Sequence, residues 1–304
     1  MMSRPLTPRK LNQHLLHVTG LGLCMVNRVR RGLIGYTSPR PFTSQQIERS
    51  VEYTLGVVKG WREALVKFAG VAEPFEGRRV LEVGPGFDLG TGLVVLAHGA
   101  KSYTAVDKHR LISKTPREFY LALLDRLNDL PGSAVARRVG ERLADRRFSD
   151  EFAYVHDSAF SLNGLPDGGF DLFVSQAVLE HFDDVRASFA RFRDKLAAGA
   201  MMLHKVDAGA HTSFLRTTDP LNHLRYSEPV WKLLRFTGSP NRLLMSDYAR
   251  IMNELDFRDV RTVPSQIMDG DYVRRTRPHL ASRFRSFPED ELGVKSFSLF
   301  AAKD

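Results

Sequence analysis

Cysteine is nearly absent from this sequence, since Cys24 is the only one among 304 residues. An intrachain disulfide framework and a zinc site built on several cysteines are therefore excluded, and a reducing compartment is the simpler expectation. Long hydrophobic runs are missing too, because no apolar stretch reaches the roughly 20 residues that a membrane-spanning helix needs. The longest such stretch, Leu15–Val26, is interrupted by His17, Thr19 and two glycines.

Acidic residues are fewer than basic ones, with 35 Asp and Glu against 44 Lys and Arg, which gives a formal net charge of +9. Such an excess favours anionic partners such as phospholipid, phosphorylated glycan or nucleic acid. The basic motif with interleaved aromatics that is typical of RNA-binding modules does not occur, so nucleic acid is not an expected partner. Hydrophobic residues at 43% and charged residues at 26% are globular values, which exclude a disordered or collagen-like chain.

The segment 11–31 joins the apolar stretch to a basic cluster of Arg28, Arg30 and Arg31. Signal peptides carry their positive charge before the apolar stretch, so the order found here argues against one. Two interpretations remain. The segment is either an N-terminal helix packed on the domain or an amphipathic anchor lying on a membrane surface. We expect a cytoplasmic protein, with peripheral membrane contact through residues 11–31 as the second interpretation.

The chain divides into a basic extension over residues 1–41, broken by prolines, and one domain over residues 42–304. Within the domain, short apolar strands alternate with helical patterns. The first helix opens at Thr43 and Gln46, which have the spacing of a capping box. Another helix is expected from about Asp183 to Leu196, stopped by Gly199. The expected strands cover residues 79–84, 102–107, 152–156, 170–175, 201–206, 257–263 and 295–302.

This alternation predicts an α/β, Rossmann-like fold with a seven-stranded, mostly parallel sheet covered by helices on both faces. The last strand is expected to be antiparallel, because no pattern of a crossover helix precedes it. Residues 109–150 form a polar helical insertion. Residues 208–245 are irregular and long for a connection, and we expect them to form a cap over the carboxyl edge of the sheet that binds the acceptor.

A glycine-rich loop, residues 82–92, follows the first strand and opens a helix. Glycines let the backbone approach a ligand closely, and a helix N-terminus offers unpaired N–H groups. The spacing departs from the dinucleotide fingerprint, because after Gly84 and Gly86 the next glycine, Gly90, comes one residue late. Glu82 also places a carboxylate where a dinucleotide-binding strand is normally apolar. Both features count against NAD.

Two carboxylates stand at the ends of the first two strands. Glu82 either faces a cationic or hydrogen-bond-donating ligand group or pairs with Arg78 or Arg79. Asp107 ends the second strand, where a carboxylate can accept hydrogen bonds from the two hydroxyls of a ribose. Its alternative is a role in the turn, and its placement favours the ligand.

These features together resemble a class I S-adenosylmethionine (SAM)-dependent methyltransferase of the small-molecule branch, similar to methyltransferases associated with glycan gene clusters. The resemblance rests on Val80-Leu-Glu-Val-Gly-Pro-Gly86, on Asp107, on His156-Asp157-Ser158 and on the run Phe170–His181, and it covers roughly residues 75–207. It departs from the usual pattern at Asp88, at Ala198-Gly199-Ala200 and in the length of the insertion, which leaves the adenine side of the pocket undefined.

The resemblance implies SAM as the cofactor and assigns its contacts. Glu82, Gly84 and Gly86 would cradle the methionine part, and Asp107 would bind the ribose. Asp157 would accept a hydrogen bond from the adenine amine, with a backbone donor from Ser158 beside it. Ser175 and Gln176 would meet the methionine carboxylate and the substrate.

The run His204-Lys-Val-Asp207-Ala-Gly-Ala-His211 supplies candidates for catalysis at the end of the fifth strand. A hydroxyl must lose its proton as it is methylated, and imidazole suits this role near neutral pH. We therefore expect O-methylation of a small polar acceptor, a sugar or glycan precursor, with His211 as the base and His204 and Asp207 as further catalytic candidates. Asp207 would orient one of the two histidines. These three residues are also a conceivable metal site, but no metal is expected.

Two other functions stay open at this stage. The chain is a SAM-binding protein without catalysis if no acceptor base exists, and a change of His211 would then have no effect. A nucleic-acid methyltransferase fits the net charge. Against it, Ser175-Gln-Ala-Val lacks the Asn/Asp-Pro-Pro-Tyr/Phe signature that is common among enzymes methylating the amino groups of nucleic acids.

Overall fold

The computed structural model describes residues 5–8, 11–34, 43–236 and 238–304. Much of the proline-broken part of the predicted extension, at residues 35–42, lies outside these ranges. Among the described residues, no helix combines the length and the apolar composition needed to cross a membrane.

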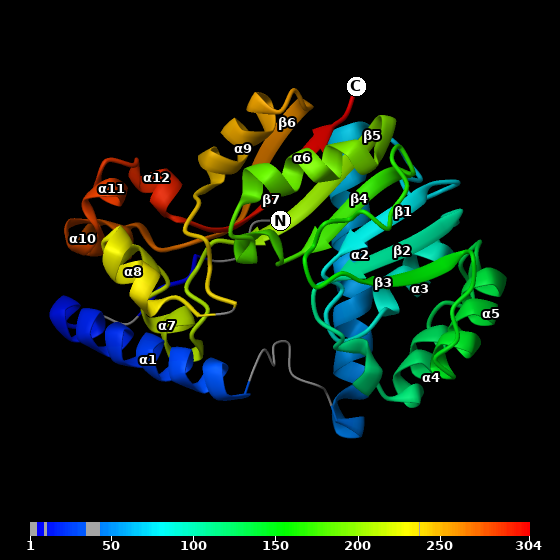
Figure 1. Cartoon of the computed structure of the whole chain (residues 1–304), viewed down its shortest axis with the longest axis horizontal. Coiled ribbons are helices and arrows are strands. Elements are labelled where there is room, and N and C mark those ends of the chain that lie inside the picture. Colours follow the sequence, from blue (N-terminus) through cyan, green and yellow to red (C-terminus); the bar gives the residue numbers. More distant parts are fainter. Residues whose placement is uncertain (1–4, 9–10, 35–42, 237) are drawn as a thin grey trace.

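A single seven-stranded sheet organises the domain, with the strand order β3-β2-β1-β4-β5-β7-β6 (Figure 1). β1 to β5 are parallel, and β7 runs antiparallel to both β5 and β6. The predicted fold class and the antiparallel last strand are therefore confirmed. The strands are β1 (Arg79–Val83), β2 (Ser102–Asp107), β3 (Phe152–His156), β4 (Phe170–Gln176), β5 (Leu196–Asp207), β6 (Arg258–Ile267) and β7 (Val294–Ala302).

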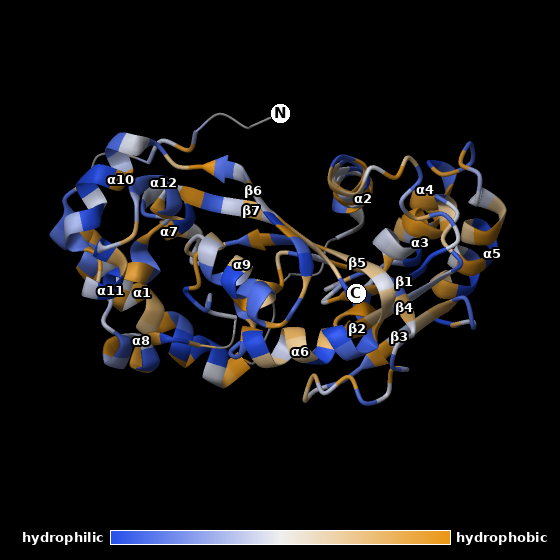
Figure 2. Ribbon diagram, turned by 90° about the horizontal axis from the view of Figure 1, so that it is seen from above, coloured by the Kyte–Doolittle hydropathy of each residue, from blue (hydrophilic) through white to orange (hydrophobic). Residues whose placement is uncertain are grey.

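Helices cover both faces of the sheet (Figure 2). The apolar side chains of one face pack with α2 (Ile47–Ala69), α3 (Gly90–Ala97), α4 (Arg117–Asp125) and α5 (Ser133–Ala144), the last two formed by the predicted helical insertion. The other face packs with α6 (Val185–Lys195) and α9 (Met245–Glu254). This burial explains why β5 contains a continuous apolar run, Ala200–Leu203, with no polar alternation.

The boundary between α6 and β5 was predicted wrongly. α6 ends at Lys195, and Leu196 already pairs with Phe170 of β4 as the first residue of β5. The pairing then shifts register, so that Met201 faces Leu172, and Gly199 takes a left-handed φ of 72° within this bulge. Gly199 therefore accommodates an irregular strand start and does not stop the helix.

A second lobe stands beside the carboxyl edge of the sheet (Figure 1). The predicted cap contributes α7 (Ser213–Thr218), η4 (Asn222–Arg225) and α8 (Glu228–Leu234). It shares an apolar cluster with the segment between β6 and β7, where Tyr272 and Phe284 are buried. That segment holds α10 (Gly270–Thr276), η5 (Arg277–His279), α11 (Ser282–Arg285) and α12 (Glu289–Leu292), and α1 (Gln13–Ile34) packs on η4 and α8. The cap is thus larger than the predicted residues 208–245.

Gly92 in α3 predicts a clear stability effect. A Cβ placed there would lie 2.4 Å from the Tyr103 ring and 2.6 Å from that of Phe152, whereas a Cβ at Gly56 in α2 would have no neighbour within 4 Å. We expect Gly92→Ala to lower the free energy of unfolding by about 1–3 kcal/mol through overpacking. Gly56→Ala, the control, should leave it unchanged or raise it by up to about 1 kcal/mol. Urea unfolding monitored by circular dichroism measures both, and equal losses would contradict the packing at Gly92.

Candidate active site

Most of the predicted site residues lie at the carboxyl edge of the sheet. β1 neighbours β4, and β4 neighbours β5, so the segments that leave these three strands lie side by side. Gly84 follows β1, Gln176 ends β4 and Asp207 ends β5. Ligands of open parallel sheets bind at this edge, where the strand order reverses.

The glycine loop is held by Asp107. The backbone N–H of Gly86 donates to Asp107 Oδ2 over 3.2 Å, and the N–H of His109 donates to Oδ1 over 2.8 Å. Gly84 has a φ of 66°, and a Cβ at this position would lie 2.7 Å from the methyl groups of Val178. Only glycine fits here, because the turn needs a left-handed backbone that touches the loop following β4.

Glu82 does not pair with either neighbouring arginine, since Arg79 bonds Asp171 instead. Its Oε2 accepts hydrogen bonds from Thr91 Oγ1 at 2.5 Å and from the Tyr103 hydroxyl at 2.6 Å. The side chain is fully buried, and this burial raises the pKa of Glu82 to about 7, although the two hydrogen bonds oppose the rise. A buried carboxyl group at the mouth of a ligand loop is typical of a functional position.

Asp157 shapes its own loop after β3. Its Oδ2 accepts from Ser161 Oγ at 3.0 Å and from the N–H of Leu162 at 2.8 Å, and its Oδ1 accepts from the N–H of Ala159 at 3.1 Å. Burial alone would raise the pKa of the Asp157 carboxyl, but these hydrogen bonds together outweigh it and lower this pKa. Ser158 beside it is exposed. The predicted contacts of both residues with adenine stay predictions.

Sequence analysis missed Tyr53 of α2. It lies near Glu82, Asp88 and Arg216, and its hydroxyl is within hydrogen-bonding reach of the Gln176 side chain. At 64% exposed, it is an uncovered aromatic ring beside the glycine loop. The sequence shows Tyr53 only as one more residue of the helical pattern of α2. Its place at the edge of the sheet follows from the fold.

His204 lies in the core and away from the edge. It is fully buried, its Nδ1 pairs with Ser175 Oγ at 2.8 Å, and its ring packs edge-on against Phe173 at 5.0 Å. Burial lowers the pKa of His204 to about 3, so the ring is neutral at any physiological pH. The structure gives this candidate base no path to an acceptor, and it turns Ser175 toward His204, away from the predicted methionine carboxylate.

Asp207 does not orient a histidine through a hydrogen bond. Its Oδ1 accepts from the N–H of Gly209 at 3.1 Å, and its Oδ2 pairs with Arg216 at 2.6 Å. The alternating strand explains why it cannot bond His204, since residues 204 and 207 point to opposite faces of β5. Its role is to fix the turn that leads to His211.

His211 has a different carboxylate partner, Glu180 of η3 (Leu179–His181). His211 Nε2 lies 3.7 Å from Glu180 Oε1, and His211 Nδ1 lies 2.8 Å from the carbonyl oxygen of Gly209. Burial alone would lower the pKa of His211, but Glu180, with help from Asp207, outweighs it and raises this pKa above 6.5. The Gly209 carbonyl fixes the proton on Nδ1 in the neutral ring, which leaves Nε2 as the basic atom.

Glu180 is 1% exposed, and neither of its oxygens has a hydrogen-bond partner among the described residues. A buried carboxylate with only a distant partner is costly unless a ligand completes it. His181 stacks edge-on against His211 at 4.8 Å, and one ligand atom from each of Glu180, His181 and His211 lies within 4.8 Å of the others. This trio could hold a metal ion, and it differs from the trio considered in the sequence.

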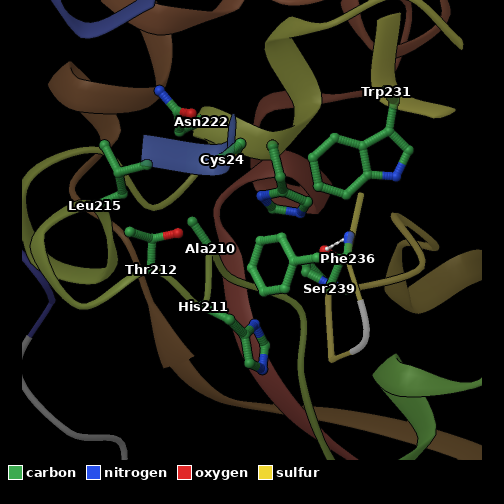
Figure 3. A pocket seen from close by; sticks show the side chains of 11 residues that line it. Cys24, Ala210, His211, Thr212, Leu215, Asn222, Trp231, Phe236 and Ser239 are labelled. Atoms are coloured by element: carbon green, nitrogen blue, oxygen red, sulfur yellow. Dashed lines mark hydrogen bonds between the residues drawn. The ribbon is translucent and has the colours of Figure 1, made fainter. Parts of the chain in front are cut away.

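A pocket lined by His211, Phe236 and Trp231 opens beside this pair (Figure 3). Figure 3 shows the ring of His211 directed away from the pocket interior, next to the ring of Phe236. The free space is about 10 Å³, close to that of a single water molecule. A sugar-sized acceptor therefore needs the cap side chains to move before it can enter here.

The cap lies over the same edge. Asn241 donates from Nδ2 to the carbonyl oxygens of Leu179 and Phe182, and its N–H donates to that of Glu180. The cap is thereby tied to η3, directly beside Glu180. The predicted role of residues 208–245 as an acceptor-binding cap stays a prediction.

Comparison with known proteins identifies part of the domain. A family model described as a methyltransferase domain matches residues 130–203, about a quarter of the chain, which run from before α5 into β5 and leave out the glycine loop. No curated protein matches the chain.

Solved structures with a similar fold include the CurJ carbon methyltransferase, at 15% identity and a TM-score of 0.49, covering 95% of this chain and 67% of that one. A putative SAM-dependent methyltransferase from Listeria monocytogenes has 14% identity and a TM-score of 0.44, covering 76% and 91%. Phosphoethanolamine N-methyltransferase 2 from Haemonchus contortus has 14% identity and a TM-score of 0.45, covering 94% and 57%. At these values the likenesses add nothing to what the strand order shows.

Residues 130–203 thus match a methyltransferase domain, and the seven-stranded order and the glycine loop after β1 agree with the predicted SAM-dependent class. SAM is the cofactor of this class, and the predicted enzyme class and cofactor are confirmed at this level.

Proposed function

We propose that this methyltransferase transfers the methyl group of SAM to a hydroxyl of a small polar acceptor, such as a sugar or glycan precursor, and that Glu180 and His211 remove the hydroxyl proton. The observation that carries the proposal is the buried Glu180–His211 pair at the carboxyl edge, on the segments that follow β4 and β5. An amine acceptor that arrives neutral needs no such base, whereas a hydroxyl does.

The residues of the edge fit SAM. The left-handed turns at Gly84 and Gly86 leave backbone close to the ligand, Asp107 ends β2 beside them, and Glu82 is buried at their base. These four residues would hold the methionine and ribose parts, while Gln176 and Tyr53 line the side toward β4. SAM, when bound, supplies an activated methyl group and leaves as S-adenosylhomocysteine.

The protein contributes alignment and proton removal. His211 Nε2 lies 3.7 Å from Glu180 Oε1, which is longer than a hydrogen bond, so this nitrogen is not already engaged by the carboxylate and can accept the proton of an acceptor hydroxyl. His211 accepts the proton at Nε2 as the acceptor oxygen bonds to the methyl carbon. Glu180 then stabilises the resulting imidazolium, and the Gly209 carbonyl keeps the ring in place.

Cofactor binding tests the proposal at its first step. We expect Asp107→Ala to weaken SAM and S-adenosylhomocysteine binding at least about tenfold, because it removes an acceptor for the ribose and frees the N–H of Gly86. Calorimetry measures both affinities, and Asp150→Ala, which changes an exposed carboxylate in the turn before β3, is the matched control. NAD binding without SAM binding would overturn the proposed function.

A further inference from the structure

α1 and the segment just before it carry more than half of the large apolar side chains that are exposed in the described part of the chain. Leu33 is 82% exposed, Val18 and Ile34 are each 64% exposed, and Leu15 is 59% exposed. Of the fourteen large apolar side chains that are exposed in the described chain, eight lie on α1 or just before it: Leu11, Leu15, Val18, Met25, Val26, Val29, Leu33 and Ile34. An apolar patch of this extent marks a binding surface.

The spacing shows that these side chains form one stripe. Leu15, Val18, Met25, Val29 and Leu33 recur at intervals of three, four or seven residues, which puts them on one face of a helix. Packing on the cap uses the opposite face, where Leu16, Gly20 and Cys24 are buried. A Cβ at Gly20 would lie 2.1 Å from Asn222 and 2.2 Å from Tyr226, so α1 sits directly on η4.

The charged side chains of α1 itself are all of one sign. The helix contains Arg28, Arg30 and Arg31 and no Asp or Glu. Arg28 bonds the carbonyl oxygen of Leu233 at the end of α8, so α8 adjoins the stripe there. Leu233 is 65% exposed and extends the apolar surface, and Lys232 beside it is exposed as well.

The first turns of α1 also line a basic groove of about 490 Å³. Three of the ten histidines of the chain, His14, His17 and His279, face it together with Arg225 and Arg285. Asp219, which is buried, forms an ion pair with Arg225. Among the described residues that line the groove there is no carboxylate, and one of them, Arg285, is an exposed cation.

We propose that the outer face of α1 docks on an anionic phospholipid surface, with the apolar stripe buried among acyl chains and the arginines against the headgroups. The membrane is the occupant that both halves of this surface fit, because apolar side chains and a basic rim together define an interfacial helix. A second copy of the chain would bring the three arginines of α1 against the same three of its partner, which like-charge repulsion opposes.

Vesicle sedimentation tests this proposal with the full-length chain. We expect binding to vesicles of phosphatidylcholine with phosphatidylglycerol and at least about tenfold weaker binding to phosphatidylcholine alone. The combined variant Leu15→Ser, Val18→Ser, Val29→Ser and Leu33→Ser should lose at least about tenfold in binding to the anionic vesicles, because it removes exposed apolar area and no packed core. Its matched control is Phe148→Ser with Val66→Ser, two exposed apolar residues on other elements, which should bind like the wild type.

A second variant removes positive charge and leaves the apolar side chains in place. Arg28→Gln with Arg30→Gln should weaken binding to anionic vesicles roughly tenfold, whereas Lys59→Gln with Lys67→Gln on the exposed side of α2 should not. Equal binding of all variants would overturn the proposal. So would a dimer in analytical ultracentrifugation that the stripe variant abolishes, because a second copy would then be the occupant.

Discussion

Turnover of His211→Ala should fall at least about a hundredfold once an acceptor is in hand, while its affinity for SAM stays nearly that of the wild type. The loss of a general base typically costs about 10²–10⁴ in rate. SAM affinity is expected to stay because His211 follows β5 and contacts Gly209, Glu180 and His181, none of which is a predicted cofactor contact. Steady-state kinetics and calorimetry measure the two quantities separately.

The pH profile distinguishes a base from a merely structural histidine. The base must be neutral to act, so activity should rise with pH through a pKa above 6.5, because Glu180 raises the pKa of His211. Glu180→Gln removes the carboxylate, which should lower kcat and move this rising limb to lower pH. His98→Ala, which changes a half-buried histidine beside Phe75, should change neither quantity.

Chelation separates the base from a metal ligand. If Glu180, His181 and His211 act without a metal, treatment with EDTA leaves turnover unchanged. A loss that a divalent cation restores would make His211 a ligand and remove it as the base. An unaltered turnover of His211→Ala would exclude His211 from the reaction altogether and favour an amine acceptor or a SAM-binding protein without catalysis.

The candidate cofactor residues were predictable because each stands at a strand end. Glu82 and Asp107 close apolar runs before a turn, and the carboxyl ends of parallel strands meet at one edge. The alternation with helices predicts parallel strands and therefore a shared edge, whereas the order of the strands was not predicted and comes from the structure. The fold class was predictable for the same reason.

The partner of His211 was not predictable in the same way. Asp207 is closer to His211 in sequence. In the turn after β5, however, the Asp207 carboxylate already accepts hydrogen bonds from Gly209 and Arg216. Glu180 approaches from another strand, and its run Leu179-Glu180-His181 reads as an ordinary helix start. His204 was predicted as a catalytic candidate because it interrupts an apolar strand. In the structure its ring is buried in the core, where it forms a hydrogen bond with the hydroxyl of Ser175 on the neighbouring strand.

The other large effect concerns Glu82 and the dependence of stability on pH. Burial raises the pKa of this carboxyl from 4.5 to about 7, with Asp88 and Asp107 adding to the rise. The folded state therefore holds the proton more tightly than the unfolded state, so stability is greatest below pH 4.5 for this group and is lost as the pH rises through about 7. This rise in the pKa corresponds to a loss of about 3 kcal/mol in the free energy of unfolding between low and high pH.

Glu82→Gln should remove this slope. Its amide oxygen can still accept from Thr91 and Tyr103, but the group no longer ionises. The free energy of unfolding of the variant, relative to the wild type, should thus rise by about 3 kcal/mol between pH 4 and pH 8. Urea unfolding at several pH values measures this difference, and Glu141→Gln on the exposed side of α5 should leave it flat.

Binding of SAM gives the same residue a second readout. If Glu82 faces a cationic or donating part of SAM, its ionised form is favoured in the complex, and binding near pH 6.5 should release a proton. Calorimetry in buffers of different ionisation enthalpy detects this release, and Glu82→Gln should abolish it. A stability slope without proton release would leave Glu82 as a buried support for Thr91 and Tyr103, outside the contacts of the cofactor. Proton release that survives in Glu82→Gln would point to Asp88, whose pKa burial also raises, to about 6.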